Sequence, residues 1–394
     1  MRLPAILLAT LVATACAAPR TTAPQAAPLV GKPLTRDSLA NFRSAGAQVL
    51  FWSPEQRLKN FAAMESLFPG HAVAAGENVR PLPRGAALPV PAAEIDTYMA
   101  ANGVTGLLVL QDGKVRLERY ADGFSANGRW TSFSVAKSFT STLVGAALRD
   151  GAIKSLSDPV TRYIPELAGS GYDGVTVRQL LTMTSGVRWN ENYTDPQSDV
   201  ARMYQIDVPP GQDPTVAYMR TLPRADQPGS KWVYKTGETN LVGVLVTRAT
   251  GKSLAAYLSE KVWRPYGMER DAFWMVDGSM QDIGGCCLSV SLRDYARMGQ
   301  FVLEGGKGVV PDDWFADATT AHAQTGAPGF GYGYQWWTYP GGRFGAQGIF
   351  GQAITIDPAK RLVIAQTASW PRATGRELSA ARLAFFERLS AAAK

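Results

Sequence analysis

Residues 134–149 have the sequence SVAKSFTSTLVGAALR and are followed by Gly151. The spacing of the apolar residues, with a glycine just past the end, predicts a helix from Ser134 to Arg149. Most of this helix is apolar enough to be buried, yet its first turn carries Ser134 and Lys137. Because these two residues are three positions apart, their side chains share one face of the helix. We therefore expect a hydroxyl and an amine to meet at the start of a buried helix.

A buried lysine in the first turn of a helix is unusual, and its position favours the uncharged amine. The positive end of the helix dipole and a dry environment both disfavour the ammonium ion. Lowering a lysine pKa from about 10.4 to about 7 or 8 takes roughly 3 to 5 kcal/mol, which burial and the dipole can supply. A neutral Lys137 can then take the proton of Ser134, while the backbone N–H of Ser134 binds an oxyanion. The structural alternative is that Ser134 caps the helix and Lys137 extends to water.

The rest of the composition removes competing kinds of active site. The chain has two histidines, His71 and His322, and no G-x-S-x-G motif, so a Ser-His-Asp triad lacks a well-placed base. Because there are only three cysteines as well, most metal sites are excluded, and we expect neither a metal nor a cofactor. The net charge of +7 is spread over 394 residues without a dense basic run, which argues against a nucleic-acid partner.

Two of the three cysteines, Cys286 and Cys287, are adjacent. Because a disulfide needs a geometry that an ordinary trans peptide between neighbours does not give, we expect two buried thiols here. No C-x-x-C pattern accompanies them, so neither zinc binding nor dithiol redox chemistry is predicted.

The amino-terminal segment predicts export. Residues 1–15 have a basic start, a short apolar stretch and a small-residue cleavage pattern, as in a signal peptide too short to span a membrane. Cys16 follows in a sequence that resembles a bacterial lipobox, although Ala13 stands where that motif usually has Leu. Residues 16–36 are rich in Ala, Pro and Thr, which predicts an unfolded tether. We expect a lipoprotein of a bacterium, anchored to a membrane through lipidated Cys16, with a soluble periplasmic protein as the alternative.

The order of the predicted elements defines the fold class. Residues 37–92 form an N-terminal strap, and Asp112-Gly113 supplies the turn of a β-hairpin. Helical patterns dominate the middle of the chain, and strands and a final helix follow. This order predicts an α+β fold, an antiparallel sheet flanked by helices (93–129 and 276–394) with an inserted all-helical domain (130–275). Besides the first helix, the predicted helices are 177–184, 240–250, 253–263 and 376–393, and the predicted strands are 105–110, 115–120, 331–339, 344–347, 352–356 and 361–367.

Ser134-Val135-Ala136-Lys137 resembles the nucleophile motif of the penicillin-binding-protein and β-lactamase superfamily, especially its class C-like serine hydrolases. Further segments agree with that family, in order, from about Pro91 to the C-terminal helix. The resemblance implies a β-lactamase-like fold and a serine that the substrate acylates. The agreeing segments are 158–160, 163–167, 180–186, 265–268, 293–299 and 331–337.

The resemblance also implies further site residues. In that family a tyrosine before a helix moves protons together with the lysine, and Tyr234 occupies its place. The third motif lies on a strand that lines the site, and Ala346-Gln347-Gly348 is the candidate, with Gln347 and Gly348 touching the substrate. The amide of Ile349 is then the second oxyanion donor, opposite the amide of Ser134. Lys235-Thr236-Gly237 spells the third motif of β-lactamases, but it leads into a helix and is rejected. Thr236 itself stands where the β-lactamase branch has Asn.

The departure from Lys-Thr-Gly bears on the substrate. Ala346 has no charge with which to hold the carboxylate of a β-lactam, so β-lactamase activity is disfavoured. The chain looks most like the 6-aminohexanoate-dimer (nylon oligomer) hydrolase and carboxylesterase branch, in which a loop tyrosine bonds the scissile amide; Tyr193 is the candidate. The resemblance implies an exported serine hydrolase of small esters or linear amides. The alternatives are a β-lactamase or D-alanyl-D-alanine carboxypeptidase and, in another class, a non-catalytic wall-binding relative.

Overall fold

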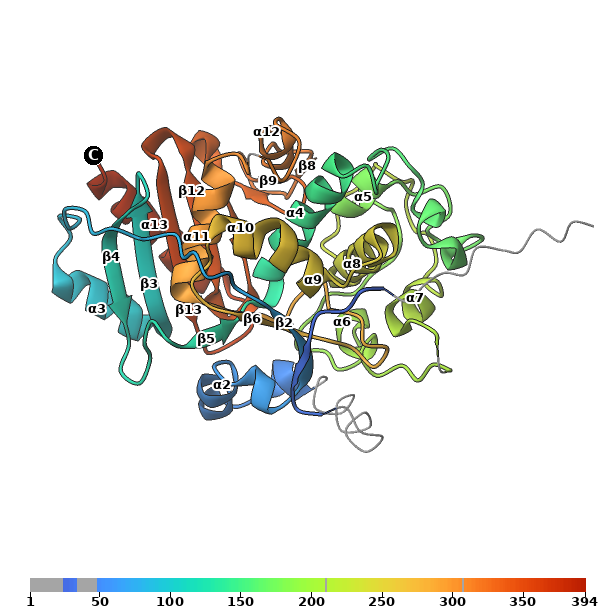
Figure 1. Cartoon of the computed structure of the whole chain (residues 1–394), viewed down its shortest axis with the longest axis horizontal. Coiled ribbons are helices and arrows are strands. Elements are labelled where there is room, and N and C mark those ends of the chain that lie inside the picture. Colours follow the sequence, from blue (N-terminus) through green and yellow to red (C-terminus); the bar gives the residue numbers. More distant parts are fainter. Residues whose placement is uncertain (1–23, 34–47, 210, 307) are drawn as a thin grey trace, which may run out of the picture.

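The larger of the two sheets has eight antiparallel strands drawn from both ends of the chain. The computed structural model describes residues 24–33, 48–209, 211–306 and 308–394, so the predicted signal peptide and Cys16 lie outside the described residues. The strand order is β4-β3-β13-β12-β11-β10-β9-β8 (Figure 1). The strands are β3 (Val104–Gln111), β4 (Lys114–Tyr120), β8 (Ala323–Gln324), β9 (Gly331–Tyr332), β10 (Trp337–Thr338), β11 (Phe344–Gln347), β12 (Ala353–Asp357) and β13 (Leu362–Ala368).

The turn between β3 and β4 is the predicted Asp-Gly turn. Asp112 and Gly113 have φ angles of 50° and 71°, the positive values that a two-residue hairpin turn needs. On its other side β3 pairs with β13, with Gln111 opposite Leu362. The strands β3 and β13, which are far apart in the sequence, are therefore neighbours inside one sheet.

Neighbouring residues of β3 belong to two different cores. Leu108 packs in the core shared with α11 (Leu292–Leu303), whereas Leu107 packs in the core shared with α3 (Ala92–Ala101) and α13 (Arg376–Ala392). Because both faces of the sheet are covered, β3 carries apolar side chains at most positions instead of alternating with polar ones. The predicted final helix is confirmed as α13.

A second, five-stranded sheet has the order β1-β2-β6-β7-β5. The edge strand β1 lies in the segment expected to be an unfolded tether, and Gln25 N donates to Gly251 O at 2.6 Å just before it. Residues 25–31 of that segment therefore pack on the folded chain, because their backbone completes a sheet edge. The next strand, β2, comes from the predicted strap. The bounds are β1 (Leu29–Gly31), β2 (Pro69–Val73), β5 (Arg129–Thr131), β6 (Ala272–Met275) and β7 (Leu288–Ser291).

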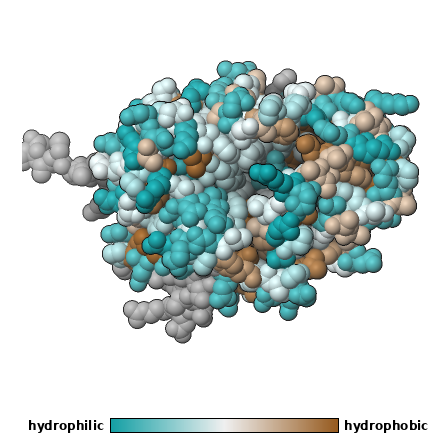
Figure 2. All heavy atoms as spheres, turned by 180° about the vertical axis from the view of Figure 1, so that it is seen from behind, coloured by the Kyte–Doolittle hydropathy of each residue, from teal (hydrophilic) through white to brown (hydrophobic). Residues whose placement is uncertain are grey.

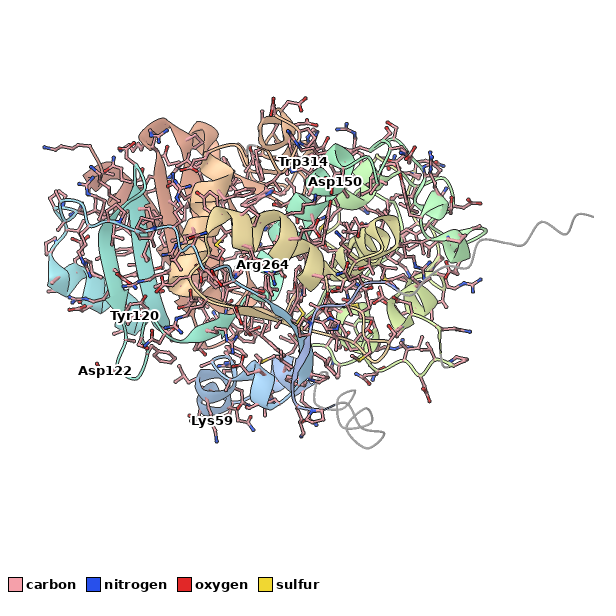
Figure 3. The ribbon with its side chains drawn as sticks, viewed as in Figure 1. Lys59, Tyr120, Asp122, Asp150, Arg264 and Trp314 are labelled. Atoms are coloured by element: carbon pink, nitrogen blue, oxygen red, sulfur yellow. A yellow bond between two sulfur atoms is a disulfide. The ribbon has the colours of Figure 1, made fainter. Side chains whose placement is uncertain are left out.

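The predicted first helix is present as one 3-10 turn, Phe133–Val135, followed by α4 (Ala136–Arg149). Trp314, labelled in Figure 3, packs against this helix: a Cβ on Gly145 would lie 2.7 Å from its indole. In the middle of the molecule α4 packs against α8, which lies on the side away from the large sheet (Figure 1). The remaining helices are α2 (Pro54–Asn60), α5 (Val177–Leu181), α6 (Asp199–Arg202), α7 (Pro214–Met219), α8 (Thr236–Thr250), α9 (Leu254–Leu258, continued by a π turn at Ser259–Trp263), α10 (Arg264–Tyr266) and α12 (Trp314–Ala318).

Three predicted elements differ from the structure in their extent, of which the helix predicted over 177–184 ends at Leu181. The predicted strand 331–339 is two short strands, because the chain turns back at Gln335, which has a φ of 64°. The Gln335 side chain is buried and donates to Leu181 O at 2.8 Å, a contact 154 residues away that no local pattern reveals. The helix predicted to begin at Asn240 begins at Thr236, which brings its first turn to the site described below.

Hydrophilic residues cover most of the face seen in Figure 2, with smaller hydrophobic areas between them. No described helix combines the length and the apolar character that crossing a membrane requires. The large hydrophobic side chains that are exposed in the described part of the chain all lie within its first 80 residues. They are Leu29, Val30, Phe51, Leu58 and Val79.

Candidate active site

The start of α4 brings the Ser134 hydroxyl and the Lys137 amine together, as their spacing predicts. Lys137 Nζ lies 3.3 Å from Ser134 Oγ. Lys137 is only 1% exposed, and Ser134 is 8% exposed. The amine therefore does not extend to water, which removes the structural alternative for this motif.

Two further oxygens hold the Lys137 amine. Nζ donates to the Thr236 hydroxyl at 3.0 Å and to the Gly285 carbonyl at 2.7 Å. Burial lowers the pKa of Lys137 to about 7, while the negative charge of Glu191 acts in the opposite direction. At neutral pH much of the amine is thus uncharged and able to accept a proton.

Tyr234 places its phenol beside the same two groups. The Ser134 side chain lies near enough to lower the pKa of this phenol, and Lys137 Nζ lies 5.3 Å from its ring centroid. Trp337 stacks on the ring, with 5.6 Å between the centroids. Burial raises the pKa of Tyr234 well above its ordinary value, so the phenol keeps its proton at neutral pH. It can hand a proton to one oxygen or nitrogen while it receives one from another.

The end of β11 lies against the turn that carries the serine. A Cβ on Gly348 would lie 2.5 Å from Ser132 O, so this close approach requires glycine. Gln347, Gly348 and Ile349 line one cavity together with Ser134. The predicted role of the Ile349 amide is compatible with this placement and stays a prediction.

Glu191 is a site residue that no sequence pattern indicated. It accepts hydrogen bonds from the Thr236 backbone N–H at 2.9 Å and from the Tyr193 hydroxyl at 2.8 Å, and also from the Trp189 indole and the Thr236 hydroxyl. Hydrogen bonds thus connect the Lys137 amine to a carboxylate through Thr236. Tyr193 does line the cavity, but its hydroxyl is bonded to Glu191, and its contact with a scissile amide stays a prediction.

Arg382 is the second residue that the sequence did not indicate. Its side chain reaches from α13 into the lining of the same cavity, where it is 6% exposed. The guanidinium donates to the Gln347 side chain and to Gln352 O at 3.5 Å, and it lies 5.0 Å from the Trp370 ring centroid. Burial lowers its pKa, but an arginine stays charged at neutral pH. Among the described residues it forms no ion pair with an acidic side chain, although the Glu191 carboxylate lines another part of the same cavity.

A disulfide joins Cys286 to Cys287, so the expectation of two thiols is wrong. Cys287 has a φ of 70°, a left-handed conformation that non-glycine residues seldom adopt. This rotation turns its side chain back toward Cys286, which an extended dipeptide does not do. Both cysteines line a small apolar pocket that Ser134 also lines.

Lys235 is next to Tyr234 but serves a different contact. Its ammonium lies 3.5 Å from Glu238 Oε1 and 3.3 Å from Ser185 Oγ, and its side chain is fully buried. It is therefore not placed to hold a substrate carboxylate, in agreement with the rejection of Lys235-Thr236-Gly237 as a third motif. Among the residues that the structure describes, no three His, Cys, Asp or Glu side chains come together as a metal site.

The fold and the similarity to known proteins identify this chain as a serine hydrolase. The chain belongs to the beta-lactamase family, because residues 92–387 match the family described as Beta-lactamase. It is 32% identical over 334 residues to the 6-aminohexanoate-dimer hydrolase of Paenarthrobacter ureafaciens, which covers 79% of this chain and 85% of that protein. The family and the fold class predicted from the motifs are confirmed.

Two other similarities are more distant. Over 199 residues the chain is 24% identical to the lovastatin esterase of Penicillium rubens, which covers 44% of this chain and 46% of that protein. The solved structure named "Putative 6-aminohexanoate-dimer hydrolase from Bacillus anthracis" matches with a TM-score of 0.74 and 23% sequence identity. The match covers 91% of this chain and 98% of the chain of that structure. At this identity the structural match shows the fold.

Proposed function

We propose that this serine hydrolase cleaves esters or small linear amides through an acyl-enzyme on Ser134. The observation that carries the proposal is the buried Lys137 amine, whose pKa is about 7 and whose Nζ lies 3.3 Å from Ser134 Oγ. Such an amine is a base at neutral pH, and a nucleophile within its reach needs no histidine. The similarity to an amide-cleaving hydrolase and to an esterase supports these two substrate classes.

In the first half of the reaction, Ser134 Oγ attacks the carbonyl carbon of the substrate. The hydroxyl proton passes to neutral Lys137 as the new C–O bond forms, and the carbonyl oxygen becomes an oxyanion. The backbone amides of Ser134 and Ile349 stabilise that oxyanion. When the intermediate collapses, the C–N or C–O bond breaks, and Tyr234 gives its proton to the leaving amine or alcohol while it receives the proton from Lys137.

In the second half, water attacks the acyl-enzyme. Lys137, again neutral, accepts a proton of the water directly or through Tyr234, and the same two amides bind the second oxyanion. The ester bond to Ser134 breaks, Ser134 Oγ takes the proton back, and the acid leaves. Because the tyrosine keeps its proton at rest, it serves both halves without a net change of charge.

The charge of Arg382 supports a particular kind of substrate. A buried guanidinium without an acidic partner is stabilised by an anionic ligand group, and a carboxylate fits its geometry. On another side of Ser134 the small pocket is apolar. We therefore propose a linear substrate with an apolar segment and a carboxylate end. Arg382 thus supplies in this cavity the positive charge that Ala346 does not have. Nitrocefin turnover is the measurement that separates a β-lactamase from an esterase or amidase.

A fluorophosphonate probe tests the nucleophile. Wild-type protein should be labelled, Ser134→Ala should not be, and the exposed-serine variant Ser125→Ala should be labelled like wild type. Turnover of p-nitrophenyl esters and linear amides well above that of nitrocefin is expected. An unlabelled wild type would support the non-catalytic wall-binding alternative, and nitrocefin turnover equal to ester turnover would support the β-lactamase or carboxypeptidase alternative.

We further propose that the chain is exported and anchored through lipid on Cys16. The support is the sequence of residues 1–16, with its basic start, apolar stretch and lipobox-like end. Expressed in a bacterium, the protein should sediment with membranes, and Cys16→Ser should release it to the soluble periplasmic fraction. A wild type that stays soluble would overturn the anchoring.

A further inference from the structure

The Cys286–Cys287 disulfide stands between two parts of the candidate active site. It belongs to the wall of the apolar pocket beside Ser134, to which Phe133 and Ile349 also contribute. Cys286 is half-buried, with the Tyr204 hydroxyl 3.8 Å from its sulfur. The bond is thus part of the surface that a substrate in this pocket would meet.

On its amino-terminal side, the disulfide adjoins the carbonyl that holds the base. Gly285 O accepts from Lys137 Nζ at 2.7 Å, and Gly285 N donates to Asn240 Oδ1 at 2.8 Å. Gly285 is closely surrounded, because a Cβ there would lie 2.7 Å from Asn240 Oδ1 and 2.9 Å from Thr236 O. The peptide bond that contains this carbonyl joins Gly285 directly to Cys286.

On its carboxyl-terminal side, the disulfide adjoins the strand that holds the turn of the nucleophile. Met275 N donates to Cys287 O at 3.1 Å. The next residue, Leu288, exchanges two hydrogen bonds with Ser132, which precedes Ser134 by two positions: Ser132 N donates to Leu288 O at 2.9 Å, and Leu288 N donates to Ser132 Oγ at 3.1 Å. The disulfide closes a small ring with the Cys286–Cys287 peptide. This ring lies between the Gly285 carbonyl, which holds the Lys137 amine, and Leu288, which holds the turn before Ser134.

We propose that the Cys286–Cys287 disulfide is a redox-sensitive positioning element, which keeps the Gly285 carbonyl on Lys137 and the apolar wall closed, so that its reduction reversibly lowers turnover. The proposal rests on the proposed function of Ser134 and Lys137. The reductant is an external dithiol: the S–S bond breaks, two S–H bonds form with two electrons and two protons from the dithiol, and the dithiol becomes a disulfide.

Opening the ring frees the rotations between Gly285 and Leu288 that the bond restricts. Lys137 loses a fixed acceptor, and water gains access to an amine that burial now keeps dry. Because that burial is what holds the pKa of Lys137 down, the rising limb of the pH–rate profile should move to higher pH on reduction. A purely structural disulfide would leave the profile of the remaining folded enzyme where it is.

The test uses the Cys16→Ser variant of the full chain, in which Cys286 and Cys287 are the remaining cysteines. The oxidised protein should show no free thiol, and dithiothreitol should produce two. With the reduced protein we expect kcat for a p-nitrophenyl ester to fall by about 5- to 100-fold, the range that a small misplacement of catalytic groups produces, and to recover on reoxidation. Adding Cys286→Ser and Cys287→Ser should give the reduced kinetics and remove the response to dithiothreitol.

The outcomes separate this proposal from the one on which it depends. If the oxidised protein contains two free thiols, or if it stays folded and equally active with an unchanged pH profile after reduction and in the double serine variant, the positioning role is wrong. If instead the oxidised wild type is neither labelled by fluorophosphonate nor active on esters or amides, the proposed function itself fails. Melting temperatures measured alongside distinguish a loss of folding from a loss of positioning.

Discussion

The rings of Phe133 and Phe350 pack against each other with 5.3 Å between their centroids, and both residues have positive φ angles, 42° and 66°. Phe133 directly precedes Ser134, and Phe350 directly follows Ile349, so the two strained residues flank the two predicted oxyanion donors. Left-handed conformations of bulky residues are unfavourable and persist only where packing imposes them. Here Phe61 packs on both rings, with centroid distances of 4.9 and 5.3 Å. A residue of the predicted strap thus helps to set the backbone of the site.

The first prediction concerns the base. The wild-type kcat/KM for an ester should rise with pH through an apparent pKa near 7, because only the neutral Lys137 accepts the serine proton. Lys137→Arg should lower kcat/KM by about a thousandfold or more, since a guanidinium stays charged. The exposed-lysine variant Lys231→Arg serves as the control and should behave as wild type. Substantial turnover by Lys137→Arg would remove lysine from the mechanism.

The second prediction links the same residue to stability. The pKa of Lys137 is about 7 in the folded chain and about 10.4 in an unfolded one, so the unfolded state binds more protons between these values and wild-type stability rises with pH there. Lys137→Met removes this dependence. The free energy of unfolding of the variant minus that of the wild type should therefore be about 2 kcal/mol larger near pH 7.5 than near pH 9. Urea unfolding at both pH values measures the difference, and equal values at the two pH settings would contradict a buried neutral amine.

The third prediction concerns Gly348. An added Cβ would meet the Ser132 carbonyl at 2.5 Å, so Gly348→Ala should push the end of β11 away from the nucleophile turn. Because the Ile349 amide moves with it, we expect kcat to fall by about 10- to 1000-fold with a smaller change in KM. Gly128→Ala is the matched control, since its Cβ would lie an ordinary 3.5 Å from its nearest neighbour. A Gly348→Ala enzyme with unchanged kcat would place the second oxyanion donor elsewhere.

The fourth prediction tests the charge in the cavity. Arg382→Gln should raise KM by about tenfold or more for linear substrates that end in a carboxylate, because a bond between charged groups is lost. The methyl esters of the same substrates should be affected much less, and this comparison within one variant controls for any disturbance of the Trp370 and Gln347 contacts. Arg376→Gln, at an exposed position, is the control and should leave KM unchanged for both the acids and their methyl esters. Equal effects of Arg382→Gln on acids and methyl esters would show that Arg382 acts through packing alone.

Much of this protein could be predicted from local sequence. The three-residue spacing of Ser134 and Lys137 requires only the pitch of a helix, and the Asp112-Gly113 turn requires only two residues that tolerate positive φ. Both features are encoded within a few positions, so the structure reproduces them. The family resemblance likewise depends on short blocks in a fixed order and is confirmed by the match over residues 92–387.

Other features depend on residues that meet only after folding. Glu191 reaches Thr236 across 45 positions, and Gly285 reaches Lys137 across 148, so no periodicity connects either pair. Arg382 appears in the sequence as one more residue of an amphipathic helix, and its unpaired charge in the cavity emerges only when α13 packs beside Gln347. The Cys286–Cys287 bond depends on a backbone rotation at Cys287 that its residue type does not favour.

The sequence alone determined which groups can react: an alcohol and an amine on one helical face, a phenol before a second helix, and no histidine suited to replace them. The tertiary structure decided in which state those groups exist and what surrounds them. Protonation depends on how much water and charge lie within a few ångströms, and that is a property of packed neighbours from distant parts of the chain, not of the order of residues in a motif.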